Sequence, residues 1–265
     1  MEVFSLWLGT PTPLLDLCVR SWCRFHKVAL YVDESFTKGF FQDLTLKGQL
    51  ELRDYDDITI SDGIDPTRHT VQEFADVWRF TYLYERGGTW LDCDLFLLRP
   101  VPLHREYIIS SELTNQSGFY KANRSFSPNI GCLKFPKGCP LLSDVLEQCL
   151  YDARKKSNSN NTKFMKIFQK KLMSHHYEYL LTAIMPPKFF CPIFWGFALD
   201  IYTFPVSEWV NRGQKYAVEL PDYKEMMEDS IGIHMWNNIA SKKGINYDIP
   251  KLGTLYYNLV EMVKK

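Results

Sequence analysis

Residues 75–94 read ADVWRFTYLYERGGTWLDCD and combine a helix pattern, a glycine pair and two aspartates one residue apart. Apolar and aromatic side chains recur at helical spacing across residues 70–85, which predicts a helix with a packing face. Gly87 and Gly88 follow, and glycine is common where helices end. The apolar residues after them predict a strand. The stretch therefore predicts a helix that folds straight back onto a strand.

The two aspartates of this stretch, Asp92 and Asp94, stand at the end of the predicted strand. Alternate residues of a strand face the same side, so we expect these carboxylates side by side, with Cys93 turned into the sheet. Neighbouring carboxylates repel each other unless a proton or a cation lies between them. Oxygen ligands suit Mn²⁺ or Mg²⁺. A pair of capping or turn aspartates without a metal is the competing interpretation.

Asp76 and Arg79 lie three residues apart on the predicted helix, so both can face the same side. The glycine turn directs this helix toward the two aspartates, where four charged side chains would converge. A plain salt bridge on the helix surface is the alternative. The apolar neighbours of Asp76, among them Trp78 and Phe80, indicate instead a helix that is buried nearly all round.

The first part of the chain alternates predicted strands with predicted helices. Apolar strands are predicted at 3–9, 27–33 and 50–56, with helices at 14–25 and 36–47. This order indicates a largely parallel α/β sheet with both faces covered. Ligands of such sheets bind beyond the carboxyl ends of the strands, and Gly9, Asp33 and Asp94 are expected there.

The later part of the chain continues with strands at 107–112, 130–135 and 231–236, and with helices at 139–154, 163–184 and 252–263. Polar residues 155–163 predict an exposed loop.

The composition fits a globular domain with a sizeable core. The chain has 265 residues, 46% of them hydrophobic, and a formal net charge of +0. The chain lacks the excess of basic residues that a nucleic-acid partner would require. Seven cysteines without paired spacing favour reduced thiols. The apolar stretch 3–8 is too short for a signal peptide or a membrane span, so we expect a soluble, cytoplasmic protein without a transmembrane segment.

Residues 75–94 resemble the sugar-binding DxD region of glycosyltransferase family 32, which has the pattern AD-x-x-R-x-x-x-L-x-x-x-GG-x-Y/W-x-D-x-D. SLWLG (5–9) is similar to the opening I-W-x-G of that family. SWCRFH (21–26), followed by ALYVDE (29–34), resembles its S-W-x-x-x-x-P and acidic-ended strand. IHMWNN (233–238) is similar to its H-x-W-N. The motifs occur in the expected order, and residues 140–225 are unmatched.

The resemblance implies a GT-A type Rossmann-like fold with a central mixed sheet flanked by helices, in a single domain of residues 1–265. It implies a nucleotide-sugar-binding half at 1–138, and an acceptor-side half with a closing segment at 139–265. The implied activity is transfer of a hexose or pentose from a UDP- or GDP-linked donor to a glycan hydroxyl, with retention of configuration and with Mn²⁺ or Mg²⁺. The expected absence of an anchor favours a bacterial or viral type over the secretory-pathway relatives.

The resemblance also implies roles for individual residues. Asp94 would bind the metal directly, Asp92 would contact the ribose, the sugar or the metal's second shell, and His234 would approach the metal or the β-phosphate. The metal candidates are thus Asp94, Asp92 and His234. Asp92, Asp94 and Arg79 are the catalytic candidates. The donor-binding candidates are Trp7, Leu8, Gly9, Asp76, Arg79, Asp92, Asn129, Trp236 and Asn237. His234 as a structural histidine and Asn129 as a turn residue remain alternatives. Trp195 is a candidate for stacking on an acceptor sugar. The lead-in that the family carries before I-W is absent, so the nucleotide is not specified.

Two other classes of function compete with this one. A strand followed by DxD also begins the haloacid-dehalogenase-like phosphatases, in which the first aspartate is the nucleophile. Those enzymes place the motif near the start of the chain, whereas here 91 residues precede Asp92. A catalytically inactive nucleotide-sugar-binding module is the third interpretation. The joint presence of the acidic pair, Asp76, Arg79 and His234 favours an enzyme.

Overall fold

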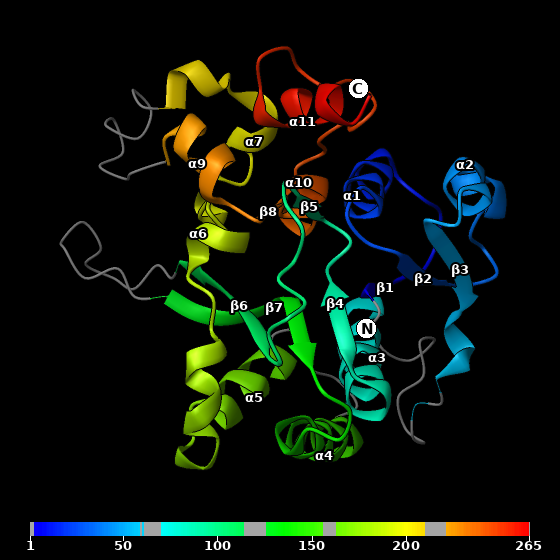
Figure 1. The fold of residues 1–265 in the computed structure, drawn as a ribbon, viewed down its shortest axis with the longest axis vertical. Coiled ribbons are helices and arrows are strands. Elements are labelled where there is room, and N and C mark those ends of the chain that lie inside the picture. Colours follow the sequence, from blue (N-terminus) through cyan, green and yellow to red (C-terminus); the bar gives the residue numbers. More distant parts are fainter. Residues whose placement is uncertain are drawn as a thin grey trace.

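The structure, a computed structural model, describes residues 3–58, 60, 70–113, 126–155, 163–209 and 221–264. Its centre is a six-stranded mixed sheet with the strand order β3-β2-β1-β4-β7-β6 (Figure 1). These strands are β1 (Val3–Trp7), β2 (Val28–Val32), β3 (Leu50–Asp54), β4 (Gly88–Leu91), β6 (Ile108–Leu113) and β7 (Phe126–Phe135). The first four are parallel to one another. β7 pairs antiparallel with β4, and β6 pairs antiparallel with β7.

The helices cover both faces of this sheet. They are α1 (Pro13–Cys23), α2 (Gln42–Leu46), α3 (Val71–Arg86), α4 (Pro140–Lys155), α5 (Lys163–Leu172), α6 (Pro187–Phe190), α7 (Asp200–Thr203), α9 (Tyr223–Asp229), α10 (Asn237–Lys242) and α11 (Leu255–Val263). Short 3-10 helices are η1 (Lys38–Phe41), η2 (Tyr55–Asp57), η3 (His175–Ala183), η4 (Trp195–Phe197) and η5 (Val206–Glu208). In Figure 1, α3, α4 and α5 lie at the lower end of the molecule, and α7, α9 and α11 lie at the upper end.

The inner parallel strands β1, β2 and β4 are mostly apolar because both of their sides are buried, whereas the edge strand β3 reads LELRD and is partly exposed. Along β1, Val3 belongs to the core under α1 and α11, and Phe4 belongs to the core under α3, α4 and α5. Leu30 and Tyr31 of β2 divide between the two cores in the same way. This is the pattern expected of a sheet with helices on each face.

Helix α3 leads directly into β4. Thr70 and Glu73 form a capping box at its start. Gly87 ends it with φ +69°, and a Cβ there would lie 2.7 Å from the backbone nitrogen of Lys137. Only glycine fits this close approach. The predicted order of helix, glycine turn and strand is confirmed.

A second sheet joins distant parts of the chain. β5 (Leu95–Leu97) pairs antiparallel with β8 (Gly232–His234), and the register places Leu95 opposite His234. The loop after β4 and the segment before α10 therefore lie side by side, as Figure 1 shows.

The prediction of a mixed α/β sheet flanked by helices is confirmed, but two details differ. The sheet is less parallel than expected, because β7 turns back antiparallel along β4. The single helix predicted at 163–184 is wrong, because α5 ends at Leu172 and η3 begins at His175. Between them, the Ser174 hydroxyl donates to the Lys171 carbonyl at 2.6 Å, a local bond that competes with helix continuation.

Residues 156–162 of the predicted polar loop lie outside the described residues. Within the described ranges, no helix combines the length and the apolar character that crossing a membrane requires.

Candidate active site and metal centre

The two aspartates of the DxD motif lie in a turn, not on a strand. β4 ends at Leu91, and the Asp92 backbone nitrogen donates the last bond to Gly131, at 2.7 Å. The Leu95 nitrogen then donates to the Asp92 carbonyl at 2.9 Å and closes the turn. The prediction that Asp92 and Asp94 lie on a strand is wrong, because β4 ends at Leu91 and the next strand, β5, begins only at Leu95. Both carboxylates nevertheless face one histidine, while the Cys93 thiol donates to the Leu6 carbonyl at 3.3 Å.

His234 lies between the two carboxylates. Its Nε2 is 3.1 Å from Oδ1 of Asp94 and 3.8 Å from Oδ2 of Asp92. The pairing of β8 with β5 produces this arrangement, because it sets His234 opposite Leu95, the residue that follows Asp94. The structure thus brings together the three residues that the resemblance gave as metal ligands.

The donor set fits a hard divalent cation. One ligand atom each from Asp92, Asp94 and His234 lies within 4.8 Å of the others. Two carboxylates and an imidazole suit Mn²⁺, and Mg²⁺ accepts the oxygens. Gly131 keeps space beside them, since a Cβ there would stand 3.6 Å from Oδ2 of Asp92 and 3.8 Å from Cδ2 of His234. The space that a side chain would fill thus borders two of the three ligands.

The protonation of this cluster reflects the mutual attraction of its members. Burial favours the neutral carboxyl of Asp94, but the His234 ring and the Asn237 backbone N–H outweigh it, so the pKa of Asp94 is lowered. Burial alone would lower the pKa of His234, yet Asp94 and Asp92 raise it to about 9. The carboxylates therefore stabilise a positive charge at this position.

Arg79 is a buried cation between two carboxylates. One Nη atom lies 3.2 Å from Asp76 and 3.2 Å from Asp92. The other donates to the Ile130 carbonyl at 2.7 Å, and the guanidinium lies 4.4 Å from the centre of the Trp90 ring. Only 5% of Arg79 is exposed, so a surface salt bridge does not describe it. The guanidinium orients Asp92 from the side of α3.

Asp76 and Trp90 complete this side of the site. Burial raises the pKa of Asp76 to about 6, although Arg79 opposes the shift. Nε1 of Trp90 donates to Oδ1 of Asp92 at 2.7 Å. Asp92 therefore has one oxygen held by Trp90 and Arg79 and the other directed toward His234.

The segment after β8 holds Asp94 from the opposite side. Trp236 has left-handed backbone angles, with φ +54° and ψ +44°, which turn the chain from β8 into α10. Its ring lies edge-on to His234, with centroids 4.2 Å apart, and its Nε1 donates to the Ile193 carbonyl. The backbone nitrogen of Asn237 donates to Oδ2 of Asp94 at 2.7 Å. Its side-chain oxygen instead accepts from the Tyr247 hydroxyl at 2.8 Å.

Trp7, Leu8 and Gly9 lie at the carboxyl end of β1, where the sheet topology places a ligand. The Gly9 backbone nitrogen donates to both carboxylate oxygens of Asp33, at 3.2 Å and 3.1 Å. Nε1 of Trp7 donates to the Thr10 carbonyl at 3.2 Å. All three residues are partly exposed. The structure joins Gly9 to Asp33 directly, as their positions after neighbouring strands predict.

Asn129 lies deeper than the other candidates, with 4% of its surface exposed. Trp195 is 42% exposed, and its ring is tilted by 48° against that of Phe194. The sequence interpretation did not include Gly131 and Glu112, which lie beside Asp92 and Asn129. No local motif marks either of them, because strand pairing and not sequence proximity brings them to the site.

Comparisons with known proteins find a matching sequence region and similar folds. Residues 15–116 match the family described as "Glycosyltransferase sugar-binding region containing DXD motif". No curated protein sequence matches the chain significantly. The solved glycosyltransferase GlyE of Streptococcus pneumoniae TIGR4 is 14% identical, with a TM-score of 0.50, over 98% of this chain and 60% of GlyE. This chain therefore spans less than two thirds of GlyE.

Two further solved structures are more distant. The PaToxG glycosyltransferase is 12% identical, with a TM-score of 0.44, over 86% of this chain and 83% of that one. A glycosyltransferase involved in the glycosylation of the major capsid of PBCV-1 is 11% identical, with a TM-score of 0.39, over 100% of both chains. The likeness to GlyE supports the GT-A type of sheet, and the family match covers Asp76, Arg79 and both DxD aspartates. Residues 15–116 therefore match a DXD-containing sugar-binding region of glycosyltransferases, and the chain has a fold similar to that of GlyE.

Proposed function

We propose that the protein transfers a hexosyl or pentosyl group from a UDP- or GDP-linked sugar to a hydroxyl group of a glycan, in the presence of Mn²⁺ or Mg²⁺. The observation that carries this proposal is the cluster of Asp92, Asp94 and His234, with ligand atoms within 4.8 Å, next to the buried Arg79. Three convergent ligands beyond the carboxyl ends of the parallel strands suit a divalent cation that accompanies a diphosphate.

In this proposal Asp94, Asp92 and His234 hold the cation, which neutralises charge on the diphosphate when bound. Arg79 and Trp90 fix the orientation of Asp92, and the Asn237 backbone N–H fixes that of Asp94. Asp76 and Arg79 line the donor side, and Asp92 also lies near the ribose.

The donor nucleotide is proposed to lie along Trp7, Leu8 and Gly9, with Asp33 behind Gly9. Trp236 and Asn237 close this side of the site after the donor enters. Residues 1–138 then mainly bind the donor and residues 139–265 mainly bind the acceptor.

We further propose that the anomeric configuration is retained. The acceptor hydroxyl attacks the anomeric carbon on the face from which the diphosphate departs. The bond from that carbon to the diphosphate oxygen breaks, the bond to the acceptor oxygen forms, and the hydroxyl proton passes to the diphosphate. Exclusion of water from the closed site limits hydrolysis of the donor.

The test is a turnover assay with UDP-glucose, UDP-galactose, UDP-N-acetylglucosamine and GDP-mannose, each with Mn²⁺ or with EDTA, which reports release of the nucleotide. We expect turnover of at least one donor with Mn²⁺ and a loss of about 100-fold or more in Asp94→Asn, because one ligand carboxylate is removed. Glu147→Gln, which replaces an exposed residue of α4, is the matched control and should behave as wild type.

Undiminished turnover in Asp94→Asn would contradict the proposal. Mn²⁺-dependent nucleotide binding without turnover of any donor would instead assign a catalytically inactive nucleotide-sugar-binding module.

A further inference from the structure

A tyrosine from the C-terminal part of the chain holds the segment that contacts Asp94. The Asn237 backbone nitrogen donates to Oδ2 of Asp94 at 2.7 Å, and the Met235 backbone nitrogen donates to the Asp94 carbonyl at 2.8 Å. The side-chain oxygen of Asn237 accepts from the Tyr247 hydroxyl at 2.8 Å. Tyr247 lies between α10 and α11. Two hydrogen bonds of one residue, Asn237, therefore connect Tyr247 to a candidate metal ligand.

The Asn237 N–H is directed at Asp94 by an unfavourable backbone conformation. Trp236, the residue before it, has left-handed angles, with φ +54° and ψ +44°. A residue other than glycine keeps such angles only where its surroundings fix them. On one side, Nε1 of Trp236 donates to the Ile193 carbonyl at 3.0 Å, and on the other, Tyr247 binds the side chain of Asn237. The bond from Tyr247 therefore helps to fix the direction of the Asn237 N–H.

Two buried tyrosines hold Tyr247 in place. The Tyr256 hydroxyl donates to the Tyr247 carbonyl at 3.0 Å, and the two ring centroids lie 6.0 Å apart. The Tyr202 ring centroid lies 5.6 Å from that of Tyr247, and the Tyr202 hydroxyl donates to the Met235 carbonyl at 2.6 Å. Burial, followed by the negative charge of Asp94, raises the pKa of Tyr247 to about 12. The Tyr247 hydroxyl therefore keeps its proton at neutral pH and can donate it to Asn237.

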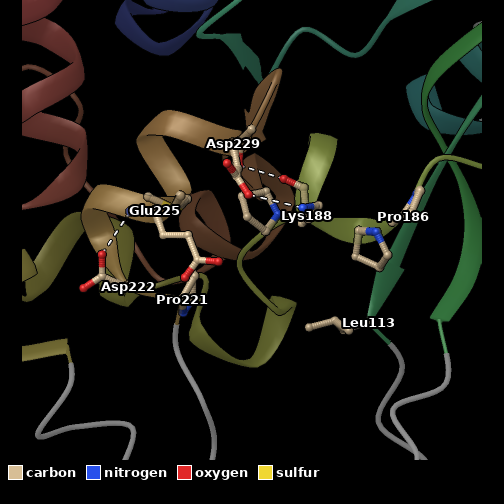
Figure 2. Close-up of a pocket in the computed structure, with 11 residues that line it drawn as sticks. Leu113, Pro186, Lys188, Pro221, Asp222, Glu225 and Asp229 are labelled. Atoms are coloured by element: carbon tan, nitrogen blue, oxygen red, sulfur yellow. Dashed lines mark hydrogen bonds and ion pairs between the residues drawn. The ribbon is translucent and has the colours of Figure 1, made fainter.

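One cavity borders Tyr247, and a second borders the chain just before β8. The first, of about 490 Å³, is lined by residues of α1 and α11 together with Tyr247. The second, of about 550 Å³, is drawn in Figure 2, with Asp222, Glu225 and Asp229 of the α9 segment along it. Among the described residues, neither cavity is lined by a metal candidate. Because Tyr247 borders open space, the loss of its hydroxyl group should disturb packing little.

We propose that Tyr247 is a positioning residue of the metal centre. Its hydrogen bond to Asn237 holds the Asn237 N–H against Asp94 and so keeps the Asp94 carboxylate oriented for the cation. The proposal deepens the glycosyl-transfer function proposed above and rests on the metal site of that function. Tyr247 contacts neither the cation nor the donor, and it acts only through Asn237.

The test measures the Mn²⁺ concentration that the protein needs to bind UDP or GDP, by isothermal titration of wild type and Tyr247→Phe at a series of Mn²⁺ concentrations. We expect Tyr247→Phe to need about tenfold more Mn²⁺ for half-maximal binding of the nucleotide, because Asp94 is less well oriented. At saturating Mn²⁺, the nucleotide affinity should return to within about twofold of wild type. The melting temperature without Mn²⁺ should stay within about 4 °C of wild type, since one hydrogen bond is lost.

A double-mutant cycle with Asn237→Ala tests the route through Asn237. This variant removes the same hydrogen bond from its other partner, so adding Tyr247→Phe to it should change the Mn²⁺ requirement by less than about twofold. Tyr257→Phe on α11 is the matched control, because the Tyr257 hydroxyl has no hydrogen-bond partner among the described residues. Glu225→Gln, which replaces an exposed residue of the pocket in Figure 2, is a second control. Both controls should need as much Mn²⁺ as wild type.

An unchanged Mn²⁺ requirement in folded Tyr247→Phe would overturn the proposal, and so would an unchanged requirement in Asn237→Ala if Tyr247→Phe fails to fold. An equal further loss when Tyr247→Phe is added to Asn237→Ala would overturn it too, since Tyr247 would then act by another route. A loss of nucleotide affinity that excess Mn²⁺ does not restore would place Tyr247 on the donor side and overturn it as well. Failure of wild type to bind UDP or GDP at any Mn²⁺ concentration would instead overturn the proposed function.

Discussion

At the scale of single residues, the site depends on how its buried charges are paired. Arg79 joins Asp76 on α3 to Asp92 in the DxD turn. Arg20 also joins two carboxylates, Asp16 at 2.8 Å and Asp43 at 2.7 Å, but its side chain is 27% exposed, against 6% for Arg79. The two arginines have similar partners and differ in burial. The effect of burial on the strength of an ion pair can therefore be measured by comparing them.

Arg79→Met should lower the free energy of unfolding by about 3 kcal/mol, because it removes a buried cation from two largely buried carboxylates. Arg20→Met should cost less than about 1 kcal/mol, because water screens its partners. Urea unfolding of both variants measures the difference. Equal losses would show that Arg79 does not compensate a buried charge.

Gly131→Ala tests the space beside the metal ligands. A Cβ there makes ordinary van der Waals contacts of 3.6 Å with Asp92 and 3.8 Å with His234, so the variant should fold with a melting temperature near that of wild type. We expect its Mn²⁺-dependent affinity for UDP or GDP to fall about tenfold, or about 1.4 kcal/mol, because the added methyl group occupies the hollow next to the ligand atoms. Unchanged affinity would mean that the ligand binds away from Gly131.

The sequence predicts those site residues that carry a local signal. Asp76, Arg79, Asp92 and Asp94 fall within one stretch, and His234 stands in a short motif of its own. Glu112 and Gly131 lie in ordinary strand sequence. Only the pairing of β6 with β7, and of β7 with β4, brings them to the site.

At the scale of elements, the junction of α3 with β4 positions the charged residues. Gly87 takes φ +69° and ψ −169°, and a Cβ added to it would clash with the backbone of residues 135–137. Gly48, which follows α2, has a similar φ of +67° with nothing within 4 Å of an added Cβ. The two glycines share positive φ but differ in the space around them.

Gly87→Ala should therefore lower the free energy of unfolding by about 3 kcal/mol, as backbone strain and a steric clash add. Gly48→Ala should cost about 1 kcal/mol, the cost of a left-handed alanine alone. Denaturant unfolding of the two variants checks this order. A smaller loss in Gly87→Ala than in Gly48→Ala would contradict the close approach at the end of α3.

His26 links the end of α1 to the segment after β5. Its Nε2 accepts a hydrogen bond from the Val101 nitrogen at 3.0 Å, and burial lowers the pKa of His26 from its ordinary value of 6.5. The unfolded chain then binds more protons than the folded one as pH falls below 6.5. The contribution of His26 to stability is thus complete above that pH and is lost as pH falls toward the folded-state pKa.

When the pH is lowered from about 7.5 to about 5.5, the free energy of unfolding should fall less in His26→Gln than in wild type. The glutamine oxygen can still accept from Val101 but does not titrate. Urea unfolding at both pH values measures the loss. The same pH dependence in both proteins would show that His26 does not titrate with folding.

Element types are well predicted where periodicity is strong and less well where a local bond intervenes. The apolar runs of β1 and β2 and the spacing of α3 give correct elements. Hydrophobic periodicity alone predicts one helix over 163–184. In the structure the helix is interrupted near Ser174, whose side chain forms a local hydrogen bond. The short α10 also depends on the left-handed Trp236, which no pattern in the sequence reveals.

At the scale of the whole molecule, the site is assembled from distant parts of the chain. The parallel strands β1 and β4 bring Gly9 and the DxD turn to one edge of the sheet. The pairing of β5 with β8 then adds His234 and Trp236 from near the C-terminal end. The alternation of strands and helices predicts the parallel part, whereas the antiparallel β7 and β6 and the small second sheet are long-range pairings that local patterns do not determine.

The most direct measurement is isothermal titration of the protein with UDP and with GDP, each with and without Mn²⁺, for wild type and Asp94→Asn. We expect one nucleotide to bind tightly only when Mn²⁺ is present, and Asp94→Asn to lose that binding while it keeps the wild-type melting temperature. That result would support the three-ligand site and name the class of donor. Binding of neither nucleotide to wild type, or equal binding to folded Asp94→Asn, would contradict the account.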